Sequence, residues 1–148
     1  MSSLDSIIKN SLSKASQHTR EVYGKNPLTA SELIDLANSR IMTLAATVRP
    51  NGRPHLSPTD FVAVDRVFYL GVDEATARYR NLKENPAVTV MLVDDGKHQA
   101  ILEGDAQFLD MKSELAKRVL EAQKKKYGWV TDAIAEFQLA KIFTWKTK

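Results

Sequence analysis

A hydroxyl and a guanidinium stand two residues apart in the middle of this 148-residue chain, at Thr76 and Arg78. The surrounding residues have helical character, and such a pair at the start of a helix is typical of an anion site. Free backbone N–H groups point out of that end of a helix, where the helix dipole favours negative charge. Arg78 can bind a phosphate through two hydrogen bonds. The pair therefore predicts a phosphate-binding corner.

Two short apolar strands are expected to position this corner. The first, residues 67–70, runs directly into Gly71 and the loop that precedes the helix. The helix ends at Asn85 and Pro86, and the second strand begins at Val88. The phosphate would then lie where one strand of a sheet gives way to a short helix.

The neighbouring strands carry the signals of a closed sheet. Side chains that alternate between two faces, with a period of two over residues 41–48, are followed by an Arg-Pro-Asn-Gly turn. This combination is typical of a hairpin. Residues 53–64 are predicted as one strand, but its two prolines require part of it to be an edge. Gly104 lies inside a long strand at residues 99–109, where it predicts a sharp bend that closes a barrel.

Helices are expected at both ends of the strand-rich region. Apolar residues at a helical period predict one over residues 4–16, and a capping-box pattern at residues 29–32 predicts a second. The predicted fold is mainly β (α+β), a six-stranded antiparallel split β-barrel with N-terminal helices and one helix in the C-terminal half. We expect a single domain over residues 1–148, with a helical segment at 1–40, a barrel core at 41–110, a helix at 111–128 and the last strand at 136–146.

Composition narrows the class of protein. Cysteine is absent, which excludes disulfides and thiol chemistry, and no apolar run is long enough to span a membrane. The N-terminus is too polar for a signal peptide, so we expect a cytoplasmic protein. The net charge of +3 does not identify a partner. His18 and His98 lack partners at metal-ligand spacing, so no metal site is expected.

Four segments together resemble a known family. LAATVRPNGRPHLSP, VFYLG, T-x-R-x-x-NL-x-x-NP-x-V and HQAILEGDAQFLD occur in this order, and the resemblance covers residues 41–110 well. They are similar to the pyridoxamine 5′-phosphate oxidase-like family of FMN-binding split barrels. The resemblance implies a homodimer with FMN in a cleft at the subunit interface, and a small-molecule substrate.

The resemblance also implies which residues contact the cofactor. One strand would contribute His55, Leu56, Ser57, Pro58 and Thr59, and the next would contribute Tyr69, Leu70 and Gly71. Thr76 and Arg78 would bind the phosphate. Gln99 and, from the partner subunit, Trp145 would complete the site. Thr59 and Ala77 stand where the family carries basic side chains, so ring and phosphate would be held with less charge. No residue stands out as a catalytic base.

Several functions remain open from the sequence. We favour an FMN-dependent oxidoreductase that transfers electrons or hydride between a nicotinamide or other reductant and a small substrate. The arginine-containing tail of the true oxidases has no counterpart before Lys148, so vitamin B6 is not the expected substrate. Deazaflavin F420 or haem could replace FMN in the same fold, and a protein that only stores or senses flavin is a further alternative. Binding of single-stranded nucleic acid is a remote one, because the strand aromatics lie mostly on core-like runs.

Overall fold

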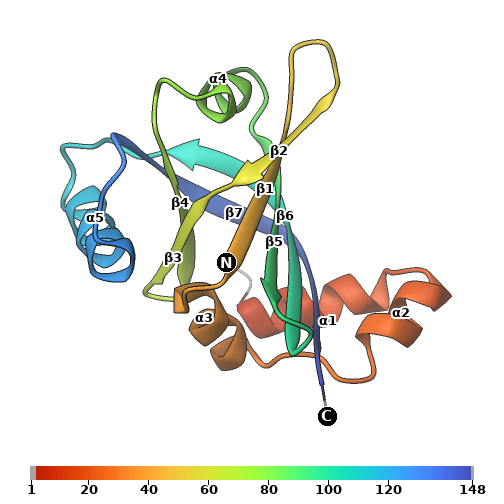
Figure 1. Cartoon of the computed structure of the whole chain (residues 1–148). Helices are drawn as coiled ribbons and strands as arrows, with labels where there is room; N and C mark the ends of the chain where they lie inside the picture. The colour runs from red at the N-terminus through yellow and green to blue at the C-terminus, as the bar shows by residue number, and fades with distance from the viewer. Residues whose placement is uncertain (1–2, 148) are drawn as a thin grey trace.

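Over residues 3–147, the chain folds into one curled antiparallel sheet with five helices around it (Figure 1). The computed structural model describes residues 3–147. The helices are α1 (Leu4–Ser13), α2 (Gln17–Tyr23), α3 (Ala30–Asn38), α4 (Ala77–Glu84) and α5 (Glu114–Tyr127), and the strands are β1 (Met42–Val48), β2 (Pro54–Pro58), β3 (Asp60–Val64), β4 (Val67–Val72), β5 (Ala87–Asp94), β6 (His98–Phe108) and β7 (Ala133–Lys146). The predicted split barrel is confirmed, with seven strands instead of six.

The seventh strand arises because residues 53–64 do not form one strand. They divide at Thr59 into β2 and β3, which lie at opposite ends of the sheet order β2-β1-β5-β6-β7-β4-β3. One residue therefore joins the two edges of the sheet, and the sheet must curl until its edges meet there. Thr59 is fixed at this point by a hydrogen bond from its backbone N–H to the Thr43 carbonyl, 3.0 Å long.

The interior of the curl is apolar and aromatic. Phe61 and Phe68 stack with ring centroids 5.4 Å apart, and Phe137 meets Phe61 edge to face at 6.3 Å. All three side chains are buried together with aliphatic residues of β1, β4, β5, β6 and β7. Gly104 supplies the expected bend, because the β6–β7 register shifts between Glu103 and Gly104, where a Cβ would lie 2.0 Å from a backbone oxygen.

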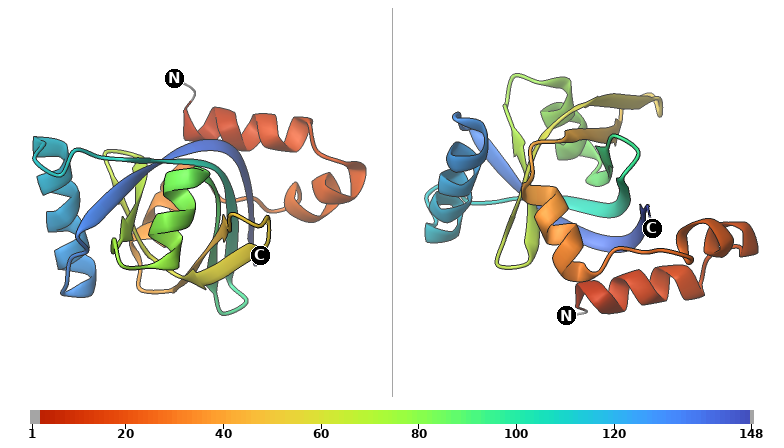
Figure 2. Two further views of the ribbon diagram at one scale, coloured as in Figure 1. Left: turned by 90° about the horizontal axis from the view of Figure 1, so that it is seen from above. Right: turned by 60° about the horizontal axis from the view of Figure 1, so that its bottom comes forward.

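The helices close the ends and flank the sheet. Figure 2 shows α4 over the middle of the curled sheet when the molecule is seen from above, while α1 to α3 lie at the opposite end. Asn81 of α4 donates its amide to the buried hydroxyl of Thr47, 3.0 Å away, which ties the helix to β1. The capping box at the start of α3 is present as predicted. No helix within residues 3–147 is long and apolar enough to cross a membrane.

The free edge of β3 is covered by side chains. The Phe61 N–H donates to the Tyr127 hydroxyl at 2.9 Å, and the Phe61 carbonyl accepts from Lys126 at 2.6 Å. Asn38 of α3 bonds both backbone groups of Ala63, at 2.8 and 3.3 Å. These contacts occupy the groups through which another strand could add to this edge.

The half-buried amine of Lys126 should make stability depend on pH. Burial lowers its pKa from 10.5 to about 8, so between these values the unfolded chain binds a proton that the folded chain does not. The free energy of unfolding of the wild type, relative to Lys126→Met, should therefore rise as pH increases from about 8 to about 10.5. Urea denaturation at several pH values measures this difference. Lys125→Met, exposed on the same helix, is the control, and a Lys126 difference that stays constant would contradict the expectation.

Candidate functional site

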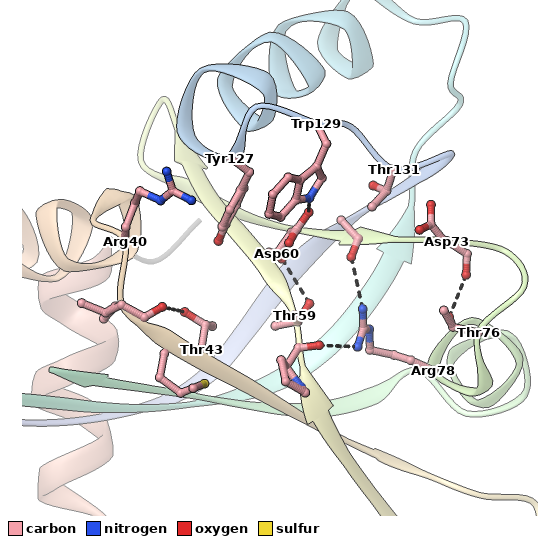
Figure 3. A pocket seen from close by; sticks show the side chains of 14 residues that line it. Arg40, Thr43, Thr59, Asp60, Asp73, Thr76, Arg78, Tyr127, Trp129 and Thr131 are labelled. Atoms are coloured by element: carbon pink, nitrogen blue, oxygen red, sulfur yellow. Dashed lines mark hydrogen bonds between the residues drawn. The ribbon is translucent and has the colours of Figure 1, made fainter. Parts of the chain in front are cut away.

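A pocket of about 500 Å³ opens where Thr59 joins the two edges of the sheet (Figure 3). Its walls come from the start of β1, the β2–β3 junction, β4 with the loop and helix that follow it, and the loop after α5. We call it the Arg78 pocket, and its lining residues are Arg40, Ile41, Met42, Thr43, Pro58, Thr59, Asp60, Gly71, Asp73, Thr76, Arg78, Tyr127, Trp129 and Thr131. This volume lies within the range of small-molecule sites, about 300–1,000 Å³.

Beside this pocket, Arg78 connects β2, at one edge of the sheet, to β4, which pairs with the opposite edge strand β3. One terminal nitrogen donates to the Ser57 hydroxyl at 2.7 Å and to the Pro58 carbonyl at 2.9 Å, both on β2. The other terminal nitrogen reaches the Gly71 carbonyl on β4 at 3.5 Å. The side chain is therefore buried, with 9% of its surface exposed, rather than extended into solvent.

The charge of Arg78 has no contacting counter-charge in the part of the chain that the structure describes. Its partners are neutral oxygens, and no carboxylate of residues 3–147 forms a salt bridge with it. Its Nε is buried and has no hydrogen-bond partner. Burial lowers the pKa of the guanidinium, while the more distant carboxylates of Asp60 and Asp73 oppose this shift. An arginine remains protonated under such conditions, so the pocket contains a desolvated cation.

Thr76 begins α4 as the sequence predicted. Its hydroxyl accepts from the Tyr79 N–H at 3.2 Å and donates to the Asp73 carbonyl at 2.7 Å. The amides of Ala77 and Arg78 belong to the first turn, which has no intrahelical acceptors for them. The side chain of Thr76 thus orients the helix, and the helix directs Arg78 toward the sheet edges.

The opposite wall of the pocket is aromatic and was not predicted. Trp129 stacks on Tyr127 with ring centroids 5.5 Å apart and planes 25° apart. The indole N–H donates to the Asp60 carboxylate at 2.7 Å, and the same oxygen accepts from the Gln123 amide at 2.9 Å. The one available signal was a tryptophan directly after Gly128, the glycine that ends the preceding helix.

Five of the residues predicted to contact a cofactor line this pocket. They are Pro58, Thr59, Gly71, Thr76 and Arg78. Ser57 lies behind them as a hydrogen-bond partner of Arg78. His55 and Leu56 do not line the pocket; Leu56 is 64% exposed and points away from the barrel.

The other four predicted residues lie outside the pocket of their own chain. Tyr69 is buried against Val62 and Ile134 beneath α5, and Leu70 belongs to the barrel core. Gln99 and Trp145 are cross-strand neighbours on β6 and β7. Across the sheet, Met42 of the pocket is the neighbour of Val93, and Val93 is the neighbour of Gln99. Trp145, next to Gln99, therefore lies three strand spacings, roughly 14 Å, from Met42.

Comparison with known proteins decides the family. The sequence profile of pyridoxamine 5′-phosphate oxidase matches residues 31–145, which is most of the chain. This chain belongs to that family. The match covers β1 to β6 and all but the last residue of β7, so the resemblance to the family seen in the sequence is confirmed.

The proteins that this chain is similar to carry different names. Heme oxygenase HutZ of Vibrio cholerae is 24% identical over 115 residues, a match that covers 72% of this chain and 65% of HutZ. The chain thus spans just under two thirds of that relative. The structure of Rv2991, a conserved hypothetical protein of Mycobacterium tuberculosis, superposes with a TM-score of 0.69 at 19% identity, over 84% of this chain and 89% of Rv2991. An F420 reductase superposes with a TM-score of 0.58 at 19% identity, over 73% of this chain and 93% of the reductase.

Gly71 should be essential to the pocket because Gln123 occupies the space of its missing side chain. A Cβ at position 71 would lie 2.2 Å from the Gln123 amide nitrogen and 2.8 Å from the Thr131 hydroxyl. Gly71→Ala should therefore break the contact between Gln123 and Asp60 and lower the free energy of unfolding by roughly 1–3 kcal/mol. Urea denaturation measures this change.

A double-mutant cycle provides the control. In a Gln123→Ala background the Gly71→Ala substitution should destabilise the protein distinctly less, because its main obstacle has been removed. Equal effects in the two backgrounds would show that the amide of Gln123 is not what excludes a side chain at position 71.

Proposed function

We propose that this chain is a flavoprotein that binds FMN in the Arg78 pocket and transfers electrons or hydride between a reductant, such as a nicotinamide, and a small substrate. The buried charge of Arg78 supports the proposal most strongly. A desolvated cation without a contacting carboxylate among residues 3–147 is unfavourable, and a phosphate dianion would supply the missing charge.

The donors beside Arg78 suit a phosphate group. The amides of Ala77 and Arg78 in the first turn of α4 are free to donate, and the helix dipole adds positive potential at the same place. The Nε–H of Arg78 has no partner but is buried, so it would reach a phosphate only when the side chain moves. The terminal nitrogens of Arg78 already bond protein oxygens, so the predicted bidentate grip would need those contacts to rearrange. The residues present fit a phosphate held by these backbone amides and by the charge of Arg78, with Nε joining once the side chain moves.

The edge of β2 suits the polar rim of a heteroaromatic ring. Thr59 bonds Thr43 of β1, and in an antiparallel ladder the residues that face the partner strand alternate. The backbone groups of Leu56 and Pro58 therefore point away from β1, and the Pro58 carbonyl accepts from Arg78 as this requires. The N–H and C=O of Leu56 point to the same side, and since Leu56 does not line the Arg78 pocket, only a ring that extends past Pro58 would reach them. Bound FMN would supply the redox chemistry, while the chain supplies position and charge.

Deazaflavin and haem are the competing cofactors within this family. The similarity of this chain to an F420 reductase and to HutZ supports these two cofactors only through the names of those proteins. Among residues 3–147, no histidine lines the Arg78 pocket, so a haem there would lack an imidazole from its own chain. A protein that only stores flavin is the other alternative, and rapid oxidation of NADH or NADPH by the flavin-loaded protein with an acceptor would exclude it.

Recognition of phosphate can be tested with a matched pair of ligands. Riboflavin has the ring of FMN without its phosphate, so the wild type should bind FMN roughly 10- to 100-fold more tightly, as expected for charged hydrogen bonds. Arg78→Lys should remove most of this preference and leave riboflavin binding nearly unchanged. Isothermal titration calorimetry measures each affinity, and thermal unfolding confirms that the variant is folded. Equal affinity of the wild type for the two flavins, or tighter binding of deazaflavin or haem, would contradict the proposal.

A second copy of the chain is proposed to complete the pocket. The inner face of β1 carries Thr43, Ala45 and Thr47, and its outer face carries apolar residues that no helix fully covers. Cross-strand neighbours continue this apolar outer face, which we define as Met42, Leu44, Leu56, Pro58, Met91, Val93, Ile101 and Trp145. Met42 is 59% exposed and also lines the Arg78 pocket. A partner on this face would border the pocket and could bring its own Trp145 near the ligand.

A charge placed on the outer face should separate the two copies. We expect the wild type to sediment at twice the chain mass of 16.6 kDa, and Leu56→Asp to shift it toward the monomer because a carboxylate cannot be buried unpaired. Analytical ultracentrifugation measures both masses. Val22→Asp, an exposed valine on α2, is the control for added charge. A wild type that sediments as a monomer at micromolar concentration would rule out this assembly.

A further inference from the structure

Trp129 presents half of its surface beside the Arg78 pocket although its position is fixed. The side chain is 51% exposed, which is unusual for a tryptophan that is also stacked and hydrogen-bonded. One face rests on the Tyr127 ring, and the indole N–H is held by the Asp60 carboxylate at 2.7 Å (Figure 3). Tyr127 is fixed in turn, because its hydroxyl accepts from the Phe61 N–H of β3.

The loop that carries Trp129 is tied down on its far side as well. Thr131 donates its backbone N–H to the Gln123 side chain at 3.2 Å and its hydroxyl to the Ala133 carbonyl at 2.8 Å. Asp132 accepts from the Glu74 N–H at 2.7 Å, which links this loop to the one that precedes α4. The indole is thus connected through rigid contacts to the elements that position Arg78.

This arrangement is that of a preformed stacking surface. An aromatic side chain whose orientation is already fixed loses little conformational freedom when a flat ring packs against it. Figure 3 shows Trp129 and Arg78 on different walls of the same opening, with Asp60 and Thr59 between them. A ligand that satisfies both walls must combine a planar conjugated ring with an anionic group on a side chain.

We infer that Trp129 is the stacking residue for the conjugated ring of the ligand, and that Asp60 is a positioning residue that sets the angle of the indole. The inference rests on the proposed function, because it concerns the same pocket, but it assigns the ring to a different residue from the phosphate. Trp129 acts on the ring and Arg78 acts on the anion. The two contributions are therefore separable by experiment.

Riboflavin and FMN again provide the measurement. Trp129→Ala should weaken both flavins by a similar factor, roughly tenfold to a hundredfold, because the two share the ring. Trp129→Phe, which keeps a smaller aromatic surface, should fall between the wild type and Trp129→Ala. Asp60→Ala should weaken both flavins by a smaller factor, since the indole keeps its stacking partner. Val130→Ala is the matched control, because Val130 is the next exposed side chain in the loop and does not line the pocket.

The outcomes separate this inference from the proposed function. If the wild type prefers FMN over riboflavin but Trp129→Ala binds both as tightly as the wild type, the stacking role is wrong and the phosphate site stands. If Trp129→Ala weakens both flavins but the wild type shows no preference for FMN, the stacking role stands and the phosphate site is wrong. If the wild type binds neither flavin, both are overturned. If Trp129→Ala fails to fold, the flavin affinities of Trp129→Phe test the stacking role instead.

Discussion

One guanidinium connects the two sides on which this sheet closes, edge strand β2 and the strand β4 that lies next to the opposite edge. Arg78 comes from α4 and donates to Ser57 and Pro58 on β2 and toward Gly71 on β4, so a single side chain spans the split in the barrel. A buried cation in this position is costly unless negative charge reaches it. The stability of the closed sheet and the proposed affinity for an anion would therefore depend on the same residue, and binding of an anion would strengthen the closure without any new protein contact.

The polarity of β1 links closure of the sheet to the proposed association of two copies. The strand places small and hydroxyl side chains inside the barrel, where Asn81 satisfies Thr47, and places its larger apolar residues outside. The Arg78 pocket opens beside this outer face, since Met42 belongs to both. Ligand binding and association of two copies would then be neighbouring events on one surface, and a single chain would present an incomplete pocket.

Much of the fold could be predicted because local signals agreed with the final architecture. Pro58 demanded an edge, Gly104 demanded a bend, and Thr76 was recognisable as a helix cap, and each has that role. The division at Thr59 was missed because two short strands separated by one residue have the same alternating pattern as one long strand.

The site was harder to predict because it depends on contacts between distant residues. A period of two in β1 cannot say which face is inside, and the buried face proved to be the one with threonines. Tyr69 and Leu70 were assigned to a ligand by resemblance, yet their side chains fill cores on either side of β4. Trp129 meets Asp60 across 69 positions of sequence, and no local pattern reports such a contact.

The connection between β2 and β3 is a single residue, so these two strands cannot separate at this point. Thr59 spans the point where the two edges of the sheet meet, and its amide is bound to Thr43. A longer connection there would allow the two edges of the sheet to separate, and the pocket between them would be lost. Length variation among proteins built on this plan should therefore collect at exposed hairpins such as residues 49–53, where Gly52 has open space around it, and avoid the β2–β3 junction.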